Sequence, residues 1–223
     1  MSGFDKITIQ KARPLPVLVL ADISGSMGEH GKIEALNKAL GEMIRSLGQQ
    51  SSLNAEIHIG IITFGEEVRP YSDPKPASQY ESLPIFSANG GTPFGEALSV
   101  TQKILENKDL IPSRSYRPTV VVISDGLPTD DWEKALEAFL ASDRGSKATR
   151  LAMTMGPDAN EEVLTLFIND PEIPVIYGKD ARDIERFFKC VTMSVTSRSV
   201  QSNPNMITQG EIKNIFEDEE LDF

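Results

Sequence analysis

Residues Val17–Gly28, reading Val-Leu-Val-Leu-Ala-Asp-Ile-Ser-Gly-Ser-Met-Gly, decide how the rest of the chain is interpreted. The first five are apolar without a break, which predicts a parallel strand covered by helices on both faces. Asp22, Ser24 and Ser26 follow at alternate positions, and Gly25 permits a bend between them. Their side chains can then point the same way. The stretch predicts a buried strand that ends in a cluster of oxygen donors.

Further apolar patterns alternate between strand and helix along the chain. Two-sided apolar runs predict strands, and spacings of three and four predict helices. Pro14 and Pro16 indicate that the first strand begins at Val17. The strands expected after it cover 57–64, 120–123, 151–155 and 174–177, and the helices cover 32–47, 94–105, 132–139, 163–167 and 182–195. The turn Phe64–Val68 predicts a short antiparallel edge strand, with 71–80 as loop. This order predicts an α/β fold with a doubly wound, Rossmann-like, mostly parallel sheet and helices on both faces.

Composition divides the chain into three parts. Residues 1–13 form a polar N-terminal extension, and 14–197 form one domain. Residues 198–223 are rich in Ser, Asn and Gln and end in Glu-Asp-Glu-Glu-Leu-Asp-Phe, which predicts a disordered acidic tail. The tail is either solvated without a role or a second docking segment.

The balance of charge and apolar residues restricts the class of protein. A net charge of -11 argues against binding to nucleic acid or to an anionic membrane surface. No apolar run is long enough to span a bilayer, and the N-terminus lacks the pattern of a signal peptide. The single cysteine, Cys190, excludes an internal disulfide framework and is interpreted as a buried, inert thiol. We therefore expect a cytoplasmic protein.

Two more segments carry oxygen donors after a strand or before a helix. Thr92 follows Gly90 and Gly91 and opens a helix, and Asp125 follows the strand at 120–123. Ligands of doubly wound sheets bind beyond the carboxyl ends of the strands, where the strand order reverses. If the first and fourth strands flank that reversal, both segments meet Asp22 there. Each segment alone is also explained as a turn or a helix cap, but their joint occurrence favours one site.

The donor set predicts the kind of metal and the kind of partner. Five hard oxygen donors without nitrogen or sulfur suit Mg²⁺, with Mn²⁺ or Ca²⁺ as alternatives, rather than zinc. Three of the five are neutral hydroxyls, so the cation would seek a further anionic oxygen from a partner's Asp or Glu carboxylate. We expect the rim that such a protein partner contacts to include Gly90, Gly91 and Asp130.

At these residues the sequence resembles the von Willebrand factor A (VWA) domain family with its metal-ion-dependent adhesion site (MIDAS), over about residues 14–197. The resemblance implies that a divalent cation is held by Asp22, Ser24, Ser26, Thr92 and Asp125. The forms of residues 21–27, 90–93 and 124–132 look most like the bacterial intracellular branch found with tellurite-resistance and stress-response systems, the TerY-like proteins. That branch implies a stress-associated scaffold for protein–protein interaction.

An enzyme is the main alternative. A phosphoryl-transfer enzyme of the haloacid dehalogenase type needs a second Asp two residues after the first, where this chain has Ser24. A serine hydrolase built on Ser26 would need a Gly-x-Ser-x-Gly elbow and a histidine after Asp125, and the chain has neither. We therefore predict a protein that is not an enzyme. A further alternative is that the metal is only structural, or absent, and the domain acts through its tail or helices.

Overall fold

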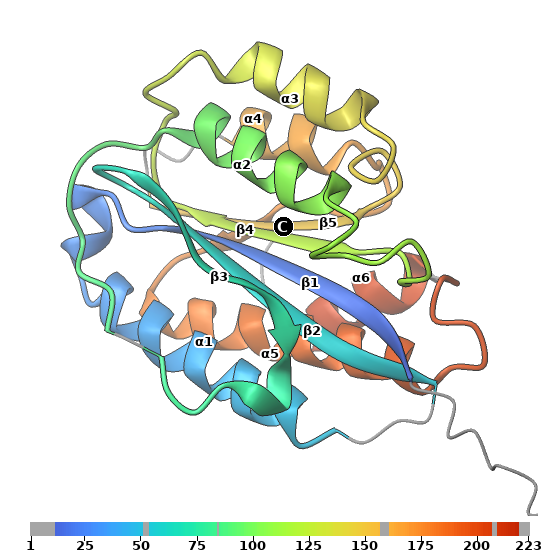
Figure 1. The fold of residues 1–223 in the computed structure, drawn as a ribbon. Helices are drawn as coiled ribbons and strands as arrows, with labels where there is room; N and C mark the ends of the chain where they lie inside the picture. Colours follow the sequence, from blue (N-terminus) through green and yellow to red (C-terminus); the bar gives the residue numbers. More distant parts are fainter. Residues whose placement is uncertain (1–11, 51–53, 84, 157–160, 207–208, 219–223) are drawn as a thin grey trace, which may run out of the picture.

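The computed structural model describes residues 12–50, 54–83, 85–156, 161–206 and 209–218. Its sheet has six strands in the order β3-β2-β1-β4-β5-β6, and only β3 is antiparallel to its neighbour (Figure 1). The strands are β1 (Arg13–Asp22), β2 (Ala55–Phe64), β3 (Val68–Pro76), β4 (Thr119–Ser124), β5 (Thr149–Met155) and β6 (Ile176–Gly178). The predicted fold class is confirmed.

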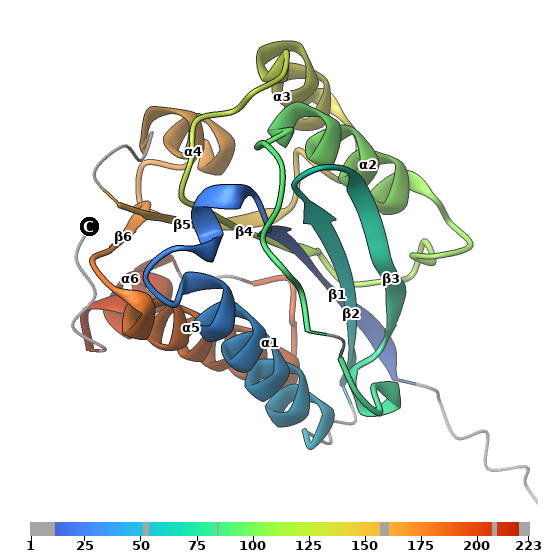
Figure 2. The ribbon, with the colours of Figure 1, turned by 90° about the vertical axis from the view of Figure 1, so that its left-hand side faces the viewer.

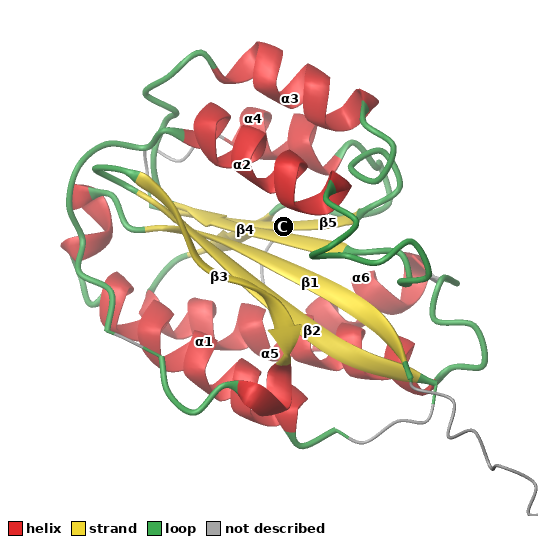
Figure 3. Cartoon of the chain, viewed as in Figure 1, coloured by secondary structure: helices red, strands yellow, loops and turns green. Residues whose placement is uncertain are grey.

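Helices cover both faces of the sheet (Figure 3). One face carries α1 (Lys32–Gly48), α5 (Ala181–Val200) and α6 (Gln209–Asp218), and the other carries α2 (Phe94–Glu106), α3 (Trp132–Ala141) and α4 (Glu161–Ile168). Two 3₁₀ turns lie at Gly25–Gly28 and Ala77–Gln79. Within the described residues, no helix combines the length and the apolar character needed to cross a bilayer.

The strand order reverses between β1 and β4. The chain proceeds from β1 through β2 to β3 on one side, and then from β4 through β5 to β6 on the other. Residues Val17–Ala21 at the centre of this sheet are fully buried, because helices pack on both of its faces. The carboxyl ends of β1 and β4 are therefore neighbours, as the expected meeting of Asp22 and Asp125 requires.

Strand β1 begins at Arg13 rather than at Val17, because Pro14 and Pro16 lie inside it. A proline cannot donate to a strand ladder. Pairing with β4 starts only at Val17, and the Pro14 carbonyl faces that side, where it accepts a hydrogen bond from the Tyr116 N–H at 2.8 Å. The nitrogens of the two prolines thus face the β4 side, where β1 has no strand partner before Val17, so no ladder hydrogen bond is lost.

The predicted antiparallel edge strand is present but extends further than expected. β3 continues to Pro76, so the predicted loop at 71–80 is wrong for its first six residues. Prolines are tolerated there because an edge strand has one side without a partner. The Tyr80 hydroxyl donates to the Ile59 carbonyl at 2.7 Å, next to a register shift in the β2–β3 pairing.

The predicted disordered tail is wrong where the structure describes it. α5 continues to Val200, and α6 packs against it. Ile212 is 3% exposed and belongs to the core, as does Cys190, which is fully buried as predicted. The predicted N-terminal extension up to residue 11, and residues 219–223, lie outside the described residues.

Replacing Ile212 with alanine should lower the free energy of unfolding by about 2 kcal/mol, because a buried isoleucine side chain is removed from the core. Urea denaturation of the whole chain measures this loss. Asn214→Ala, two residues further along α6 and exposed, is the matched control and should change the stability little. Equal stability of the two variants would show that α6 does not pack on α5 in solution.

Candidate metal site

Three loops are joined by backbone hydrogen bonds at the carboxyl end of the sheet (Figure 2). The Gly25 N–H donates to the Gly90 carbonyl at 2.9 Å, and the Asn89 N–H donates to the Ile23 carbonyl at 2.7 Å. The Glu66 N–H donates to the Asn89 carbonyl at 3.0 Å, which adds the β2–β3 turn. Gly90 has φ +82°, and a β-carbon there would lie 2.2 Å from the Glu66 nitrogen. Glycine is therefore required for this close approach.

Four of the five predicted donors form one chain of hydrogen bonds. The Ser24 N–H donates to Asp22 Oδ1 at 2.7 Å, and the hydroxyls of Ser24 and Ser26 are 3.1 Å apart. The Ser26 hydroxyl then donates to Asp125 Oδ1 at 2.7 Å. Ser124, which the sequence analysis did not select, donates its hydroxyl to Asp22 Oδ2 at 2.5 Å. Asp22 and Asp125 therefore belong to one polar cluster across β1 and β4.

The carboxyl group of Asp22 is fully buried, and it makes no ion pair with a described residue. Burial raises its pKa from 3.8 to about 6, although hydrogen bonds from Ser124 and Ser24 act in the opposite direction. The neighbouring charge of Asp125 adds to the increase. A carboxylate held in this way would be stabilised by a cation placed beside it.

A lysine supplies a positive charge at the other aspartate. The Lys32 ammonium lies 2.5 Å from Asp125 Oδ2, and the two side chains are 13% and 0% exposed. Its nitrogen is also 3.5 Å from the Ser26 carbonyl oxygen. Lys32 is the first residue of α1, where a positive charge is disfavoured by the helix dipole. That unusual position is the sequence signal that identifies Lys32 as part of the site.

Thr92 does not cap α2, although its sequence position suits a cap. The helix begins at Phe94, and its first free N–H groups, those of Gly95 and Glu96, donate to the carboxylate of Asp130 at 3.0 and 2.8 Å. Among the described residues the Thr92 hydroxyl makes no hydrogen bond. A β-carbon at Gly126 would lie 3.0 Å from Thr92 Oγ1 and 3.9 Å from Ser26 Oγ. The hydroxyl of Thr92, the fifth predicted donor, therefore lies beside the same cluster without a hydrogen-bond partner of its own in the described structure.

Thr129 holds the Thr92 segment in place. Its hydroxyl accepts a hydrogen bond from the Thr92 N–H at 3.0 Å, and its own N–H donates to the Thr92 carbonyl at 3.0 Å. The sequence does not reveal this contact, because Thr129 also stands where a cap of α3 would be expected. The α3 cap is Asp131 instead. The loop after β4 thus positions the loop before α2.

The three predicted rim residues have different surroundings. Gly90 and Gly91 are exposed, and Gly90 serves the loop contact described above. Asp130 is half-buried and its carboxylate is committed to the first turn of α2. Contact of these residues with a partner stays a prediction.

Replacing Asp130 with alanine should lower the stability by about 1–2 kcal/mol, because two N–H groups of α2 lose their acceptor. Asp131→Ala is the control: Asp131 occupies the N-cap position of α3, but its carboxylate accepts no hydrogen bond from the backbone of that helix and contacts only the exposed Lys134, at 3.2 Å, and such pairs contribute little. Thermal unfolding of both variants measures the difference. A loss no larger for Asp130 than for Asp131 would contradict the cap.

The chemistry of the cluster suits a hard divalent cation. Two carboxylates and three hydroxyls supply oxygen donors, which Mg²⁺, Mn²⁺ and Ca²⁺ prefer. No group of three or more His, Cys, Asp or Glu side chains occurs in the described part of the chain that could hold a metal in another way. The Lys32 ammonium already shows that the cluster stabilises a positive charge.

The fold and this cluster define a Rossmann-like α/β domain with an oxygen-donor site where the strand order reverses. Residues 17–127 match the sequence profile of the family described as von Willebrand factor type A domain. The match and the shared fold show that this chain contains a von Willebrand factor type A domain. A search of curated protein sequences found no significant match.

Solved structures share the fold at low sequence identity. A von Willebrand factor type A protein from Catenulispora acidiphila has a TM-score of 0.62 at 18% identity, covering 82% of this chain and 43% of that one. The pilus adhesin SpaC from Lactobacillus rhamnosus GG has a TM-score of 0.66 at 15% sequence identity, covering 85% of this chain and 31% of that one. Proximal thread matrix protein 1 from the mussel byssus, with a zinc-occupied MIDAS motif, has a TM-score of 0.60 at 12% sequence identity, covering 83% of this chain and 48% of that one. This chain spans less than half the length of each.

Proposed function

We propose that this domain binds a protein partner through a divalent cation held by Asp22, Ser24, Ser26, Thr92 and Asp125. The observation that carries the proposal is the hydrogen-bonded chain from Asp22 to Asp125, with the Thr92 hydroxyl beside it, at the carboxyl ends of β1 and β4. The mussel protein with a zinc-occupied MIDAS motif supports the idea that this fold accepts a metal. The pilus adhesin among the neighbours supports a role in binding.

Each part of the cluster has a defined role in this proposal. The hydroxyls of Ser24, Ser26 and Thr92 would bind Mg²⁺, Mn²⁺ or Ca²⁺, while the two aspartates supply negative charge. When bound, the metal acts as an electron-poor centre that attracts an Asp or Glu carboxylate of the partner. Gly90 and Gly91 lie exposed on the rim beside it. Four of the five donors are buried and Ser26 is exposed, so the cluster is reached from the side of Ser26.

The resemblance of residues 21–27, 90–93 and 124–132 to TerY-like proteins supports a narrower proposal. The domain would be a cytoplasmic scaffold in a bacterial stress response of the tellurite-resistance type. The net charge of -11 supports this by disfavouring nucleic acid and anionic membranes as partners.

The geometry also favours binding over catalysis. Ser24 stands where a phosphoryl-transfer enzyme of the haloacid dehalogenase type needs an acid or base. Of the two histidines, His58 pairs with Glu56 at 2.8 Å on β2, and His30 is exposed beside Glu29. Neither contacts Ser26 in the described structure. We therefore propose that the cluster holds a ligand and does not transform one.

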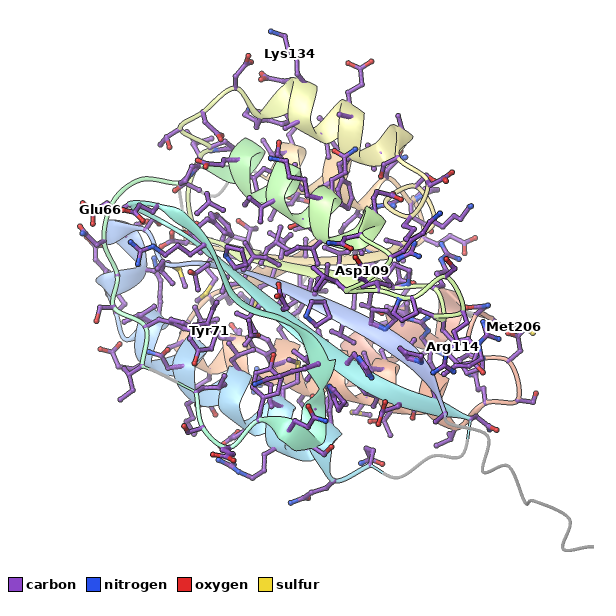
Figure 4. The ribbon with its side chains drawn as sticks, viewed as in Figure 1. Glu66, Tyr71, Asp109, Arg114, Lys134 and Met206 are labelled. Carbon is purple, nitrogen blue, oxygen red and sulfur yellow. The ribbon has the colours of Figure 1, made fainter. Side chains whose placement is uncertain are left out.

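The experiment compares partner capture by the whole chain and by Asp22→Ala, each in Mg²⁺ and in EDTA, with bound proteins identified by mass spectrometry. Proteins that require both Mg²⁺ and Asp22 are the expected result. Asp109→Ala is the control, because it removes the same charge from an exposed position in the loop after α2, well apart from Glu66 and the metal-site loops (Figure 4). Identical capture under all conditions would refute the proposal.

A further inference from the structure

Positive side chains gather at the end of the sheet opposite the metal site. Figure 4 places Arg114 at one end and Glu66, beside the metal-site loops, at the other. The chain has 22 Lys and Arg against 33 Asp and Glu, so such a gathering is unexpected from composition. It is formed by the loops before β4 and β5, the start of β5 and the end of α5. Its members are Arg117, Arg144, Lys147, Arg150 and Arg198. None of the five forms an ion pair with a described residue.

The guanidinium groups are fixed by neutral backbone acceptors. Arg144 donates to the carbonyls of Leu105 and Ile111 at 2.7 and 2.5 Å, and Arg117 Nε donates to the Lys147 carbonyl. Carbonyl oxygens orient these cations without neutralising them. The positive charges also repel one another. The pKa of Arg198 is lowered to about 10, first by burial and then by the positive charge of Arg117. Carboxylates also lie close to these cations: Asp170 acts in the opposite direction on the pKa values of Arg117 and Arg150, and Glu106 accepts a hydrogen bond from the Arg144 backbone N–H at 2.7 Å.

A cleft of about 620 Å³ opens among these residues. Arg117, Arg144 and Lys147 line it, and no acidic side chain does. Its apolar wall is formed by Ile111 and Pro118. The volume falls within the range of pockets that bind small molecules. The cleft thus combines three cations with an apolar surface on one side.

Unpartnered buried hydroxyls are a second, independent feature of this region. Among the described residues, two buried side-chain oxygen or nitrogen atoms lack a hydrogen-bond partner, Ser115 Oγ and Thr149 Oγ1. Ser115 lines the cleft, and Thr149 lines an adjoining cavity of about 190 Å³ that shares Arg117 with it. A buried polar atom without a partner in the protein is costly, so each of these hydroxyls is available to pair with a bound group.

We propose that this cleft binds a phosphate monoester of small-molecule size, with its oxygens held by Arg117, Arg144, Lys147 and the Ser115 hydroxyl. A phosphate monoester is close to a dianion at neutral pH and offers three acceptor oxygens, which match three cations and a hydroxyl. A carboxylate has one charge and two oxygens and would leave donors unused. The organic part of the ligand lies against Ile111 and Pro118.

Calorimetric titration of the whole chain tests the proposal with phenyl phosphate, inorganic phosphate and phenol as probes, in EDTA so that the metal site is silent. Phenyl phosphate is expected to bind more tightly than inorganic phosphate, and phenol not to bind. Equal affinity for the two phosphates would overturn the part of the proposal that concerns an organic ligand. No heat from either phosphate at millimolar concentration would overturn all of it.

Variants locate the binding. Lys147→Gln should weaken phenyl phosphate binding about tenfold or more, since one charge-assisted contact is lost. Lys134→Gln removes the same charge from exposed α3 and should bind like the wild type. Ser115→Ala should weaken binding without lowering the melting temperature, because the hydroxyl has no partner to lose. Equal binding by the Lys147 and Lys134 variants would refute the site.

Discussion

Replacing Asp22 with asparagine should abolish Mg²⁺ binding and, at the same time, make the metal-free domain more stable at neutral pH. The first effect follows because the buried carboxylate supplies half of the cluster's carboxylate charge. The second follows because burial raises the pKa of Asp22 from 3.8 to about 6. At pH 7 the folded protein therefore carries a charge that is stabilised better in the unfolded chain. Asparagine keeps the shape and removes the charge.

The sign of the pH dependence follows from the raised pKa of Asp22. Below pH 3.8 the Asp22 carboxyl is protonated in both the folded and the unfolded chain, so the fold keeps its full stability. As the pH rises from 3.8 through about 6, the unfolded chain loses this proton more readily than the folded protein does, and the fold is destabilised. The full difference corresponds to about 3 kcal/mol, of which weakened hydrogen bonds from Ser24 and Ser124 offset a part. The advantage of Asp22→Asn over the wild type should therefore grow by about 1 kcal/mol between pH 5 and pH 7.5.

Thermal unfolding in EDTA at these two pH values, and titration with Mg²⁺ at neutral pH, measure both effects. A variant with Asp109→Asn, which changes an exposed carboxylate, should behave as the wild type does in both experiments. Two results would contradict the interpretation of the cluster. One is undiminished Mg²⁺ binding by Asp22→Asn. The other is a stability difference between variant and wild type that does not change with pH.

The order of strands and helices could be predicted because the apolar patterns are strong. Val17–Ala21 is apolar on both faces, which only a covered central strand requires, and the structure buries all five residues. The position of β4 beside β1 followed from the fold class and is confirmed. The strand ends were less predictable: Pro14 and Pro16 lie within β1 because its first residues have a partner on one side only. That depends on the neighbouring strand and is invisible in the local sequence.

Contacts between distant segments explain why the surroundings of the cluster were only partly predicted. Thr92 was equally suitable as a helix cap and as a ligand. The cap role passes to Asp130, which comes from a different loop. Thr129 and Ser124 likewise act on residues 37 and 102 positions away. The Ser124–Asp22 pair depends on the register between β1 and β4, and the other contacts depend on how the loop after β4 meets the start of α2. A single sequence reveals neither.

The C-terminal segment was mispredicted for a compositional reason. Its Ser, Asn, Gln, Asp and Glu content resembles that of disordered chains. Ile212 and Ile215 are three positions apart and suffice to place one face of α6 against α5. The average composition of the segment does not show this short apolar stripe.

Replacing Lys32 with methionine should increase the affinity for Mg²⁺ about tenfold or more, equivalent to about 1.4 kcal/mol. The ammonium lies 2.5 Å from Asp125 Oδ2, so it satisfies the same carboxylate that a cation would use. Its positive charge also repels any metal bound there. Methionine keeps the length of the side chain and removes both effects. In the wild type, the Lys32 ammonium would thus compete with Mg²⁺ for Asp125 and lower the affinity for the metal, although all five proposed metal ligands are present.

The same variant should be less stable than the wild type in EDTA, by about 3 kcal/mol, because Asp125 keeps a buried charge without its partner. Mg²⁺ should restore most of this lost stability. Adding Mg²⁺ should therefore raise the melting temperature of Lys32→Met more than that of the wild type. Lys38→Met is the matched control on the same helix: Lys38 pairs with Glu185 at 2.7 Å, but its side chain is 56% exposed. Such a surface pair contributes at most about 1 kcal/mol, and its removal should leave Mg²⁺ affinity unchanged. If both lysine variants bind Mg²⁺ equally, Lys32 is a structural partner of Asp125 and does not compete with the metal.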